Sequence, residues 1–400
     1  YQESLRHILM NHNTVTSLYR GILSGLSNST KHPVAGKAAA AGLRALMPIV
    51  SVPTNFAGEV GLHLGGAGRA EHRAAGPGGG HGIHAGLGVA GRVGPAPLIC
   101  SAYLAAEGLE QPLLEELERA GVAIQAWHGR LALSPDPPRE CAWALEVWTA
   151  PEEHAAPSVK AAADALRGVQ RNWAAYGAGH HRRMALIAER LPPVRAAPLR
   201  FPDPAPTSHL GAWTLLDADR LLFSPTKTSP FPLGECRFVE DHLGPPSRAY
   251  LKLWEALTRL GERPGPGARC VDLGASPGGW TWALAGLGAR VRAVDKAALD
   301  PRVAGMPGVE QVLDSAFALP VEPVEWLFSD VIAYPARLLA LVERWIAAGS
   351  VQRIVCSVKF QGATDHAAAD AFAQVPGGRL VHLFHNKHEL TFLWGRPGPA

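Results

Sequence analysis

The chain has 400 residues, enough for two or three domains of ordinary size. Its content of 47% hydrophobic and 18% charged residues is that of a globular protein and excludes a largely disordered one. The net charge of +3 is mildly basic, which is compatible with a nucleic-acid partner but does not require one.

The targeting and cysteine patterns favour a cytoplasmic protein. No run of 18 apolar residues occurs, and no basic flank precedes an apolar stretch, so we expect neither a membrane span nor a secretory signal. Because the chain opens on Tyr1, we expect its natural start to lie further upstream. The five cysteines lie far apart without a C-x-x-C pair, which excludes a zinc ribbon and is typical of a reducing compartment.

Residues 1–95 form a Gly/His-rich segment. Between residues 58 and 94 there are 14 glycines with four scattered histidines. Such a composition buries too little apolar area to offset the entropy of the chain, so we expect this segment to be poorly ordered. A metal-binding His/Gly tract is the alternative.

Residues 96–205 are expected to form a small α+β module that helps to recognise RNA, and residues 206–235 a linker with a strand pair. In the module, Ser158 is a plausible N-cap for the second helix. Apolar spacing predicts strands at 98–104, 121–124 and 131–133, helices at 109–120, 158–175 and 184–191, and the strand pair at 213–222.

Residues 236–400 alternate between strands and helices. This alternation predicts an α/β fold with a Rossmann-like, mostly parallel, doubly wound sheet. Two further strands, at 380–384 and 389–394, are separated by only about four residues, which is too short for a parallel crossover, so the last strand should be antiparallel. The parallel strands are expected at 270–273, 291–295, 309–313, 326–329 and 354–358, with helices at 279–287 and 335–348.

The first of these strands ends in the sequence D-L-G-A-S-P-G-G-W, residues 272–280. Its glycines permit a close backbone approach, and the next helix begins with free N–H groups at the edge where such sheets bind ligands. No Lys-Ser/Thr follows and the spacing is not G-x-G-x-x-G, which excludes a P-loop and the dinucleotide fingerprint. Asp272 and Asp295 suit a zwitterionic cofactor, the first near an ammonium group and the second on ribose hydroxyls. A plain strand-to-helix turn is the alternative.

This loop resembles the S-adenosylmethionine loop of the FtsJ-like ribose 2′-O-methyltransferases. The sequences S-P-F-P-L-G at 229–234 and P-S-R-A-Y-L-K-L at 246–253 resemble the bacterial M type of these enzymes, which methylates a cytidine 2′-hydroxyl of 23S ribosomal RNA. The resemblance covers residues 209–395 and implies S-adenosyl-L-methionine as cofactor, with Asp314 near its adenine. The implied cofactor-binding residues are Asp272, Gly274, Ser276, Pro277, Gly278, Gly279, Trp280, Asp295, Asp314 and Asp330.

The same resemblance implies a catalytic Lys-Asp-Lys-Glu tetrad, matched here by Lys252, Asp330, Lys359 and Glu389. A ribose hydroxyl is a poor nucleophile, and a lysine can take its proton only when neutral, although a free lysine has a pKa of ~10.4. Burial or a neighbouring cation lowers that pKa. We therefore hypothesise that Lys359 is the base, that Lys252 supplies the second positive charge, and that the carboxylates orient both lysines. With these groups present, no metal is expected.

The implied partner is RNA, either 23S ribosomal RNA or a ribosomal precursor. Two departures from the family bear on the target nucleotide: residues 360–365 are not basic, and the region before the catalytic domain is short. The alternatives are a methyltransferase acting on a protein or small molecule, and a non-catalytic RNA-binding protein of the same fold. Candidate RNA contacts are His180, His181, Arg182, Arg183, Lys227, Arg237 and Arg248.

Overall fold

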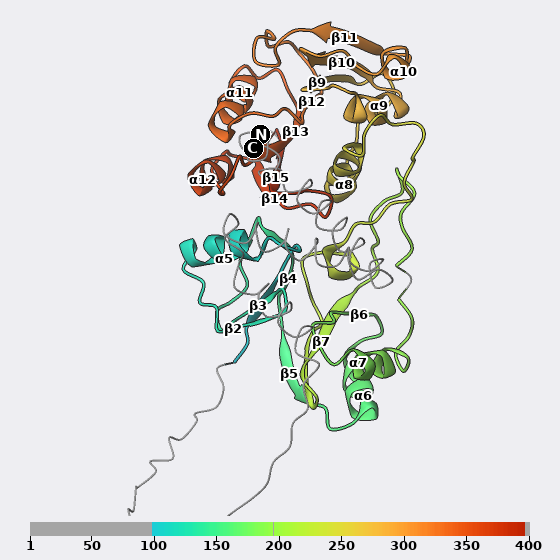
Figure 1. The fold of residues 1–400 in the computed structure, drawn as a ribbon, viewed down its shortest axis with the longest axis vertical. Coiled ribbons are helices and arrows are strands. Elements are labelled where there is room, and N and C mark those ends of the chain that lie inside the picture. The colour runs from blue at the N-terminus through green and yellow to red at the C-terminus, as the bar shows by residue number, and fades with distance from the viewer. Residues whose placement is uncertain (1–97, 195, 397–400) are drawn as a thin grey trace, which may run out of the picture. The chain divides into compact units, whose positions relative to one another are not determined.

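The computed structural model describes residues 98–194 and 196–396, which fold around three sheets (Figure 1). The expectation for residues 1–95 lies outside these ranges. No helix within them combines the length and the hydropathy that a membrane crossing needs.

The first sheet is antiparallel, with the order β2-β3-β1-β4, and α5 packs against it through Leu113 and Leu117. The strand predicted at 121–124 is wrong. The N–H groups of Gly121 and Val122 donate to carbonyls in the last turn of α5, so these residues close the helix, and the strand begins later. The elements are β1 (Ser101–Ala105), α5 (Glu110–Arg119), β2 (Ala126–His128), β3 (Leu131–Ser134) and β4 (Ala144–Trp148).

The second sheet has the order β5-β8-β7-β6 and packs against α6 and α7. Ser158 caps α6 as predicted, accepting a hydrogen bond from the N–H of Ala161 at 3.0 Å. The helix predicted to reach residue 175 ends at Val169, because residues 173–175 pair with β7 instead. The elements are β5 (Glu152–Ala155), α6 (Val159–Val169), β6 (Trp173–Ala175), α7 (His181–Ala188), β7 (Gly211–Asp217) and β8 (Arg220–Ser224).

The strand pair that we assigned to the 206–235 segment consists of β7 and β8. The boundary drawn between residues 205 and 206 therefore runs through one sheet, with β5 and β6 on one side of it and β7 and β8 on the other.

The third sheet has seven strands in the order β11-β10-β9-β12-β13-β15-β14. The pairs from β11 to β13 are parallel, and β15 lies antiparallel between β13 and β14, which confirms the mostly parallel sheet with an antiparallel last strand. Its strands are β9 (Arg269–Leu273), β10 (Arg290–Asp295), β11 (Val309–Leu313), β12 (Trp326–Ser329), β13 (Arg353–Lys359), β14 (Gly378–Val381) and β15 (Glu389–Gly395).

Helices cover both faces of this sheet (Figure 1). Side chains of α8 and α9 pack with Cys270 of β9, whereas those of α11 pack with its neighbour Val271. Because both faces of the central strands β9, β12 and β13 are buried, these strands are mostly apolar, which is why the sequence pattern predicted them well. The helices are η2 (Pro232–Gly234), α8 (Tyr250–Leu260), α9 (Gly279–Gly286), α10 (Pro301–Ala304), α11 (Pro335–Ala347) and α12 (His366–Ala373).

Lys227 was predicted to contact RNA, and this prediction is wrong. Its side chain is 0% exposed and lies 2.6 Å from the Glu146 carboxylate on β4. It also donates to the carbonyl oxygens of Ser229 and Phe231 at 2.6 Å. Burial lowers the pKa of Lys227, against the opposing pull of Glu146. The ammonium group therefore ties β4 to the irregular segment that follows β8.

We expect Lys227→Met to destabilise the protein by about 3–5 kcal/mol, because it leaves the Glu146 carboxylate buried without a cation. The double variant Lys227→Met/Glu146→Gln should recover part of this loss. Urea denaturation measures both. The control is Lys160→Met, whose side chain is 75% exposed in its pair with Asp164 and which should cost less than about 1 kcal/mol. Equal losses in Lys227→Met and Lys160→Met would contradict this account.

Candidate active site

Four charged side chains meet at one edge of the third sheet, namely those of Lys252, Asp330, Lys359 and Glu389. Lys252 projects from α8, Asp330 follows β12, and Lys359 at the end of β13 is the register partner of Glu389 at the start of β15. The distances from Lys252 Nζ are 2.6 Å to Asp330 Oδ1 and 3.2 Å to Glu389 Oε1. Lys359 Nζ lies 3.1 Å from Asp330 Oδ1 and donates to the Asp330 carbonyl oxygen. The sequence-predicted tetrad is thus one connected charge cluster.

The cluster places two lysines against two carboxyl groups, and all four side chains are largely buried. The side chains of Lys252, Asp330, Lys359 and Glu389 are 11%, 17%, 20% and 9% exposed. Burial alone would lower the pKa of Lys252, but the carboxylates of Asp330 and Glu389 outweigh it and raise that pKa. Burial alone would raise the pKa of Asp330, but the two lysines outweigh it and lower that pKa. Lys252 is therefore held as a cation, and Asp330 as an anion shared by two lysines.

The glycine turn that follows β9 lies directly against this cluster. Gly274 has a φ of +76°, and a Cβ atom there would lie 2.6 Å from the Cα atom of Val331. The N–H of Asp330 donates to the Leu273 carbonyl at 3.2 Å. Only glycine at position 274 lets the turn and the chain at Asp330 approach this closely. Of the predicted cofactor residues, Ser276, Pro277, Gly278 and Gly279 lie in the same turn.

Asp295 ends β10 and Asp314 follows β11, on the other side of β9 from β12 and β13. The Asp295 carboxylate accepts hydrogen bonds from the N–H groups of Ser276 at 3.1 Å and Ala297 at 2.9 Å. The N–H of Asp314 donates to the Asp295 carbonyl at 3.1 Å, so these two residues are adjacent. The edge thus carries carboxylate acceptors on one side and the charge cluster on the other. Such acceptors fit S-adenosylmethionine, because its ribose hydroxyls and its ammonium group both donate hydrogen bonds.

The side chains of Asp272 and Trp280, from which we expected cofactor contacts, are buried in this structure. Trp280 is buried and donates its indole N–H to the Ala249 carbonyl at 2.9 Å. The Asp272 carboxylate is fully buried and accepts from the Thr281 hydroxyl at 2.6 Å, while its other oxygen has no hydrogen-bond partner among the described residues. Burial raises the pKa of Asp272 to about 7, the bond from Thr281 opposes this, and Asp330 and Asp295 add to it.

Sequence reasoning missed Glu255, a fully buried carboxylate on α8. It accepts from the N–H groups of Phe384 at 3.0 Å and His385 at 3.1 Å and is paired with Arg259. These bonds hold the connection from β14 to β15, and therefore the start of the strand that carries Glu389. An ionisable residue within the apolar run of a helix was the available signal.

The fully buried Asp272 gives the stability of the protein a distinct pH dependence. An unfolded aspartate has a pKa of ~3.9, so between about pH 4 and pH 7 the unfolded chain loses a proton that the folded protein keeps. Stability should therefore fall as the pH rises through this window, by an amount of the order of 4 kcal/mol, and stay constant above it. Asp272→Asn keeps an acceptor for Thr281 and should lack this fall. Urea denaturation at pH 5 and pH 8 measures the difference, and parallel losses in both proteins would refute it.

Comparison with known proteins finds similarity in the part of the chain that carries the third sheet. Residues 245–334 match the family of FtsJ-like methyltransferases. A ribosomal RNA large subunit methyltransferase M from Halorhodospira halophila is 39% identical over 156 residues, which are 36% of this chain and 46% of the relative. The protein of the same name from Laribacter hongkongensis is 34% identical over 187 residues, which are 42% of this chain and 53% of the relative.

The chain thus spans about half the length of the curated relatives that it matches. Among solved structures, fibrillarin from Aeropyrum pernix matches 45% of this chain and 81% of its own at 17% identity and a TM-score of 0.28. The residues that match the FtsJ-like methyltransferase family, 245–334, include Lys252 and Asp330 of the charge cluster.

Proposed function

We propose that this protein transfers the methyl group of S-adenosylmethionine to a ribose 2′-hydroxyl of RNA, in large-subunit ribosomal RNA. The observation that carries the proposal is the connected cluster in which two lysines share the Asp330 carboxylate beside the glycine turn. The FtsJ-like domain and the name of the relatives support the reaction class and the substrate.

When bound, S-adenosylmethionine supplies an electrophilic methyl group on a sulfonium. The task left to the protein is to take the proton from the attacking hydroxyl, and Lys359 is our candidate. The Asp330 carboxylate is nearer to the Nζ of Lys252, at 2.6 Å, than to that of Lys359, at 3.1 Å. Asp330 therefore holds Lys252 more closely, and Lys359 is the lysine that we assign to the proton transfer. General-base assistance of this kind is worth roughly 10²–10⁴-fold.

The two alternative functions explain the charge cluster less well than RNA methylation does. A methyltransferase for a protein or small molecule would use the same glycine turn, but it gives no reason for two lysines on one carboxylate. A non-catalytic RNA-binding protein of this fold would not need Lys252, Asp330, Lys359 and Glu389 to remain in mutual contact.

An exposed apolar surface beside the cluster favours a substrate that carries a base. Ile332 and Tyr334 follow Asp330 closely and are 77% and 69% exposed. Large apolar side chains exposed beside a polar site mark binding surfaces, and unpaired RNA bases stack on aromatic rings. This loop follows β12, on the same side of β9 as Lys359 and on the opposite side from Asp314. Tyr334 is therefore our candidate for stacking on a base of the substrate.

We expect Lys359→Ala to lower kcat by about 10²-fold or more, and Lys359→Arg to fail equally because a guanidinium stays protonated. The Kd for S-adenosylmethionine should change little. Transfer of a labelled methyl group to ribosomal RNA from cells that lack the protein, followed by nuclease mapping, gives the rate and the position. Lys160→Ala, on the exposed surface of α6, is the control. Near-normal rates in Lys359→Ala would exclude Lys359 as the base, and label in a base or in protein would end the ribose assignment.

Tyr334→Ala should raise KM for RNA by about tenfold, since stacking is worth ~1–3 kcal/mol per base, while Tyr334→Phe keeps the ring and should stay near wild type. The Kd for S-adenosylmethionine, measured by calorimetry, should be the same in all three proteins. A weaker cofactor Kd with an unchanged KM for RNA would instead assign Tyr334 to the cofactor.

A further inference from the structure

Trp143 lies just before β4 in the first sheet, yet its indole ring contacts the residues next to two members of the charge cluster. The ring is stacked on His388, which precedes Glu389, with 5.4 Å between ring centroids. It is 5.6 Å from Phe360, which follows Lys359. Phe360 and His388 are themselves 5.6 Å apart, so the three rings form one aromatic cluster next to the end of β13 and the start of β15, in which Trp143 and Phe360 are buried and His388 is partly exposed.

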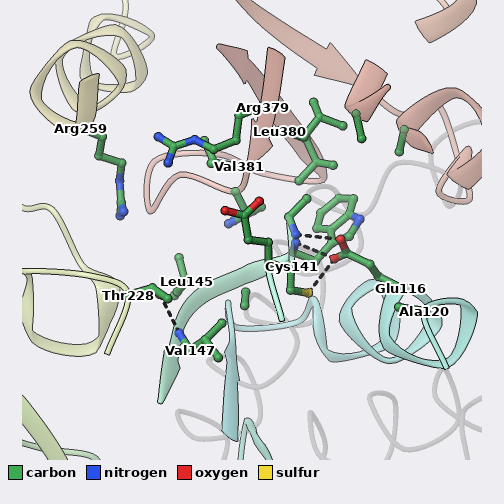
Figure 2. Close-up of a pocket in the computed structure, with 18 of the residues that line it drawn as sticks. Glu116, Ala120, Cys141, Leu145, Val147, Thr228, Arg259, Arg379, Leu380 and Val381 are labelled. Atoms are coloured by element: carbon green, nitrogen blue, oxygen red, sulfur yellow. Dashed lines mark hydrogen bonds between the residues drawn. The ribbon is translucent and has the colours of Figure 1, made fainter. Parts of the chain in front are cut away.

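The backbone that carries Trp143 is fixed from both sides. The Glu116 carboxylate of α5 accepts from the Cys141 thiol at 2.8 Å and from the N–H groups of Ala142 at 2.7 Å and Trp143 at 2.9 Å (Figure 2). The Ala142 carbonyl accepts from the N–H of His382 at 2.6 Å. The indole ring is therefore held by a rigid segment.

The chain after Lys359 is held by the same helix. His366 lies 2.7 Å from Glu115 of α5, and Thr364 is hydrogen-bonded to His388 at 2.9 Å. The loop between Lys359 and His366 is therefore held at its start by the aromatic cluster and at its end by α5.

We propose that Trp143 is a positioning residue, which sets the places of Lys359 and Glu389 by filling the space behind Phe360 and His388. Successive side chains at a strand end point to opposite sides, so a ring packed on residues 360 and 388 acts on residues 359 and 389 through the backbone. The first sheet would then be part of the catalytic apparatus. The expected effect on kcat rests on the proposed function, but the expected effect on the position of Lys359 does not.

A cavity next to Trp143 supports the proposal. A space of about 520 Å³ borders Trp143, and its lining includes Leu145, Arg379 and Leu380 (Figure 2). Removal of the indole ring would enlarge a space that already exists, so Phe360 and His388 would have room to shift. A displacement of about 1 Å is enough to cost a catalytic group much of its effect.

The test compares Trp143→Ala and Trp143→Phe with Trp173→Ala. Trp173 is a buried tryptophan of the second sheet, whose indole N–H donates to Leu166. The first measurement is competitive acetylation with acetic anhydride, scored by mass spectrometry as the labelling of Lys359 relative to the exposed Lys160. The second is kcat per S-adenosylmethionine site, with the sites titrated by calorimetry.

In Trp143→Ala, Lys359 should loosen from Asp330, its relative labelling should rise several-fold, and kcat per site should fall about tenfold or more. Trp143→Phe should lie between this variant and wild type, and Trp173→Ala should match wild type in both measurements. Labelling and kcat within about twofold of wild type in a folded Trp143→Ala would overturn the proposal. If that variant does not fold, Trp143→Phe decides by the same threshold. Absence of methyl transfer in the wild type would reject the proposed function, while the labelling ratio would still test the role of Trp143.

Discussion

One carboxylate organises the candidate active site, because Asp330 serves both lysines at once. The Nζ atoms of Lys252 and Lys359 both lie within salt-bridge distance of Asp330 Oδ1, and the second also bonds to the carbonyl of the same residue. A carboxylate between two amines attracts both and so holds them close to each other. The position of Asp330 is in turn fixed by the N–H bond to Leu273 and by the turn at Gly274. These backbone contacts therefore fix the glycine turn and the charge cluster relative to each other.

The domain around this unit is held by apolar packing that extends beyond its own sheet. A single buried cluster joins Leu113 and Trp143 of the first sheet's layer with Val358, Phe360 and Leu390 at the cluster end of the third sheet. Burial of this kind is the main source of folding free energy and is not directional. The directional interactions are the hydrogen bonds to Glu116, which fix the segment that carries Trp143.

The sequence predicted the elements whose signal is local. Strands buried on both faces appear as short apolar runs, and the turn after β9 has a specific pattern, so the third sheet and the four members of the charge cluster could be placed in advance. The errors lie where distant partners decide. Lys227 has no local feature that separates it from a solvated lysine, and only the fold brings Glu146 to it. Asp272 begins the motif of the turn, which suggested a contact with a ligand, and only the sheet shows that its carboxylate is enclosed. The aromatic cluster joins residues more than 200 positions apart, and no periodic pattern in the sequence predicts their contact.

The position of β15 has a consequence for how the protein is made. This strand is inserted between β13 and β14, both of which precede it in the chain. During translation β14 has no neighbour in the sheet until β15 emerges from the ribosome, and Lys359 lacks the strand that carries Glu389. The ribosome must therefore synthesise β15 before Glu389 can reach Lys252. Until this seventh strand of the sheet pairs with β13 and β14, the nascent chain lacks one carboxylate of the charge cluster.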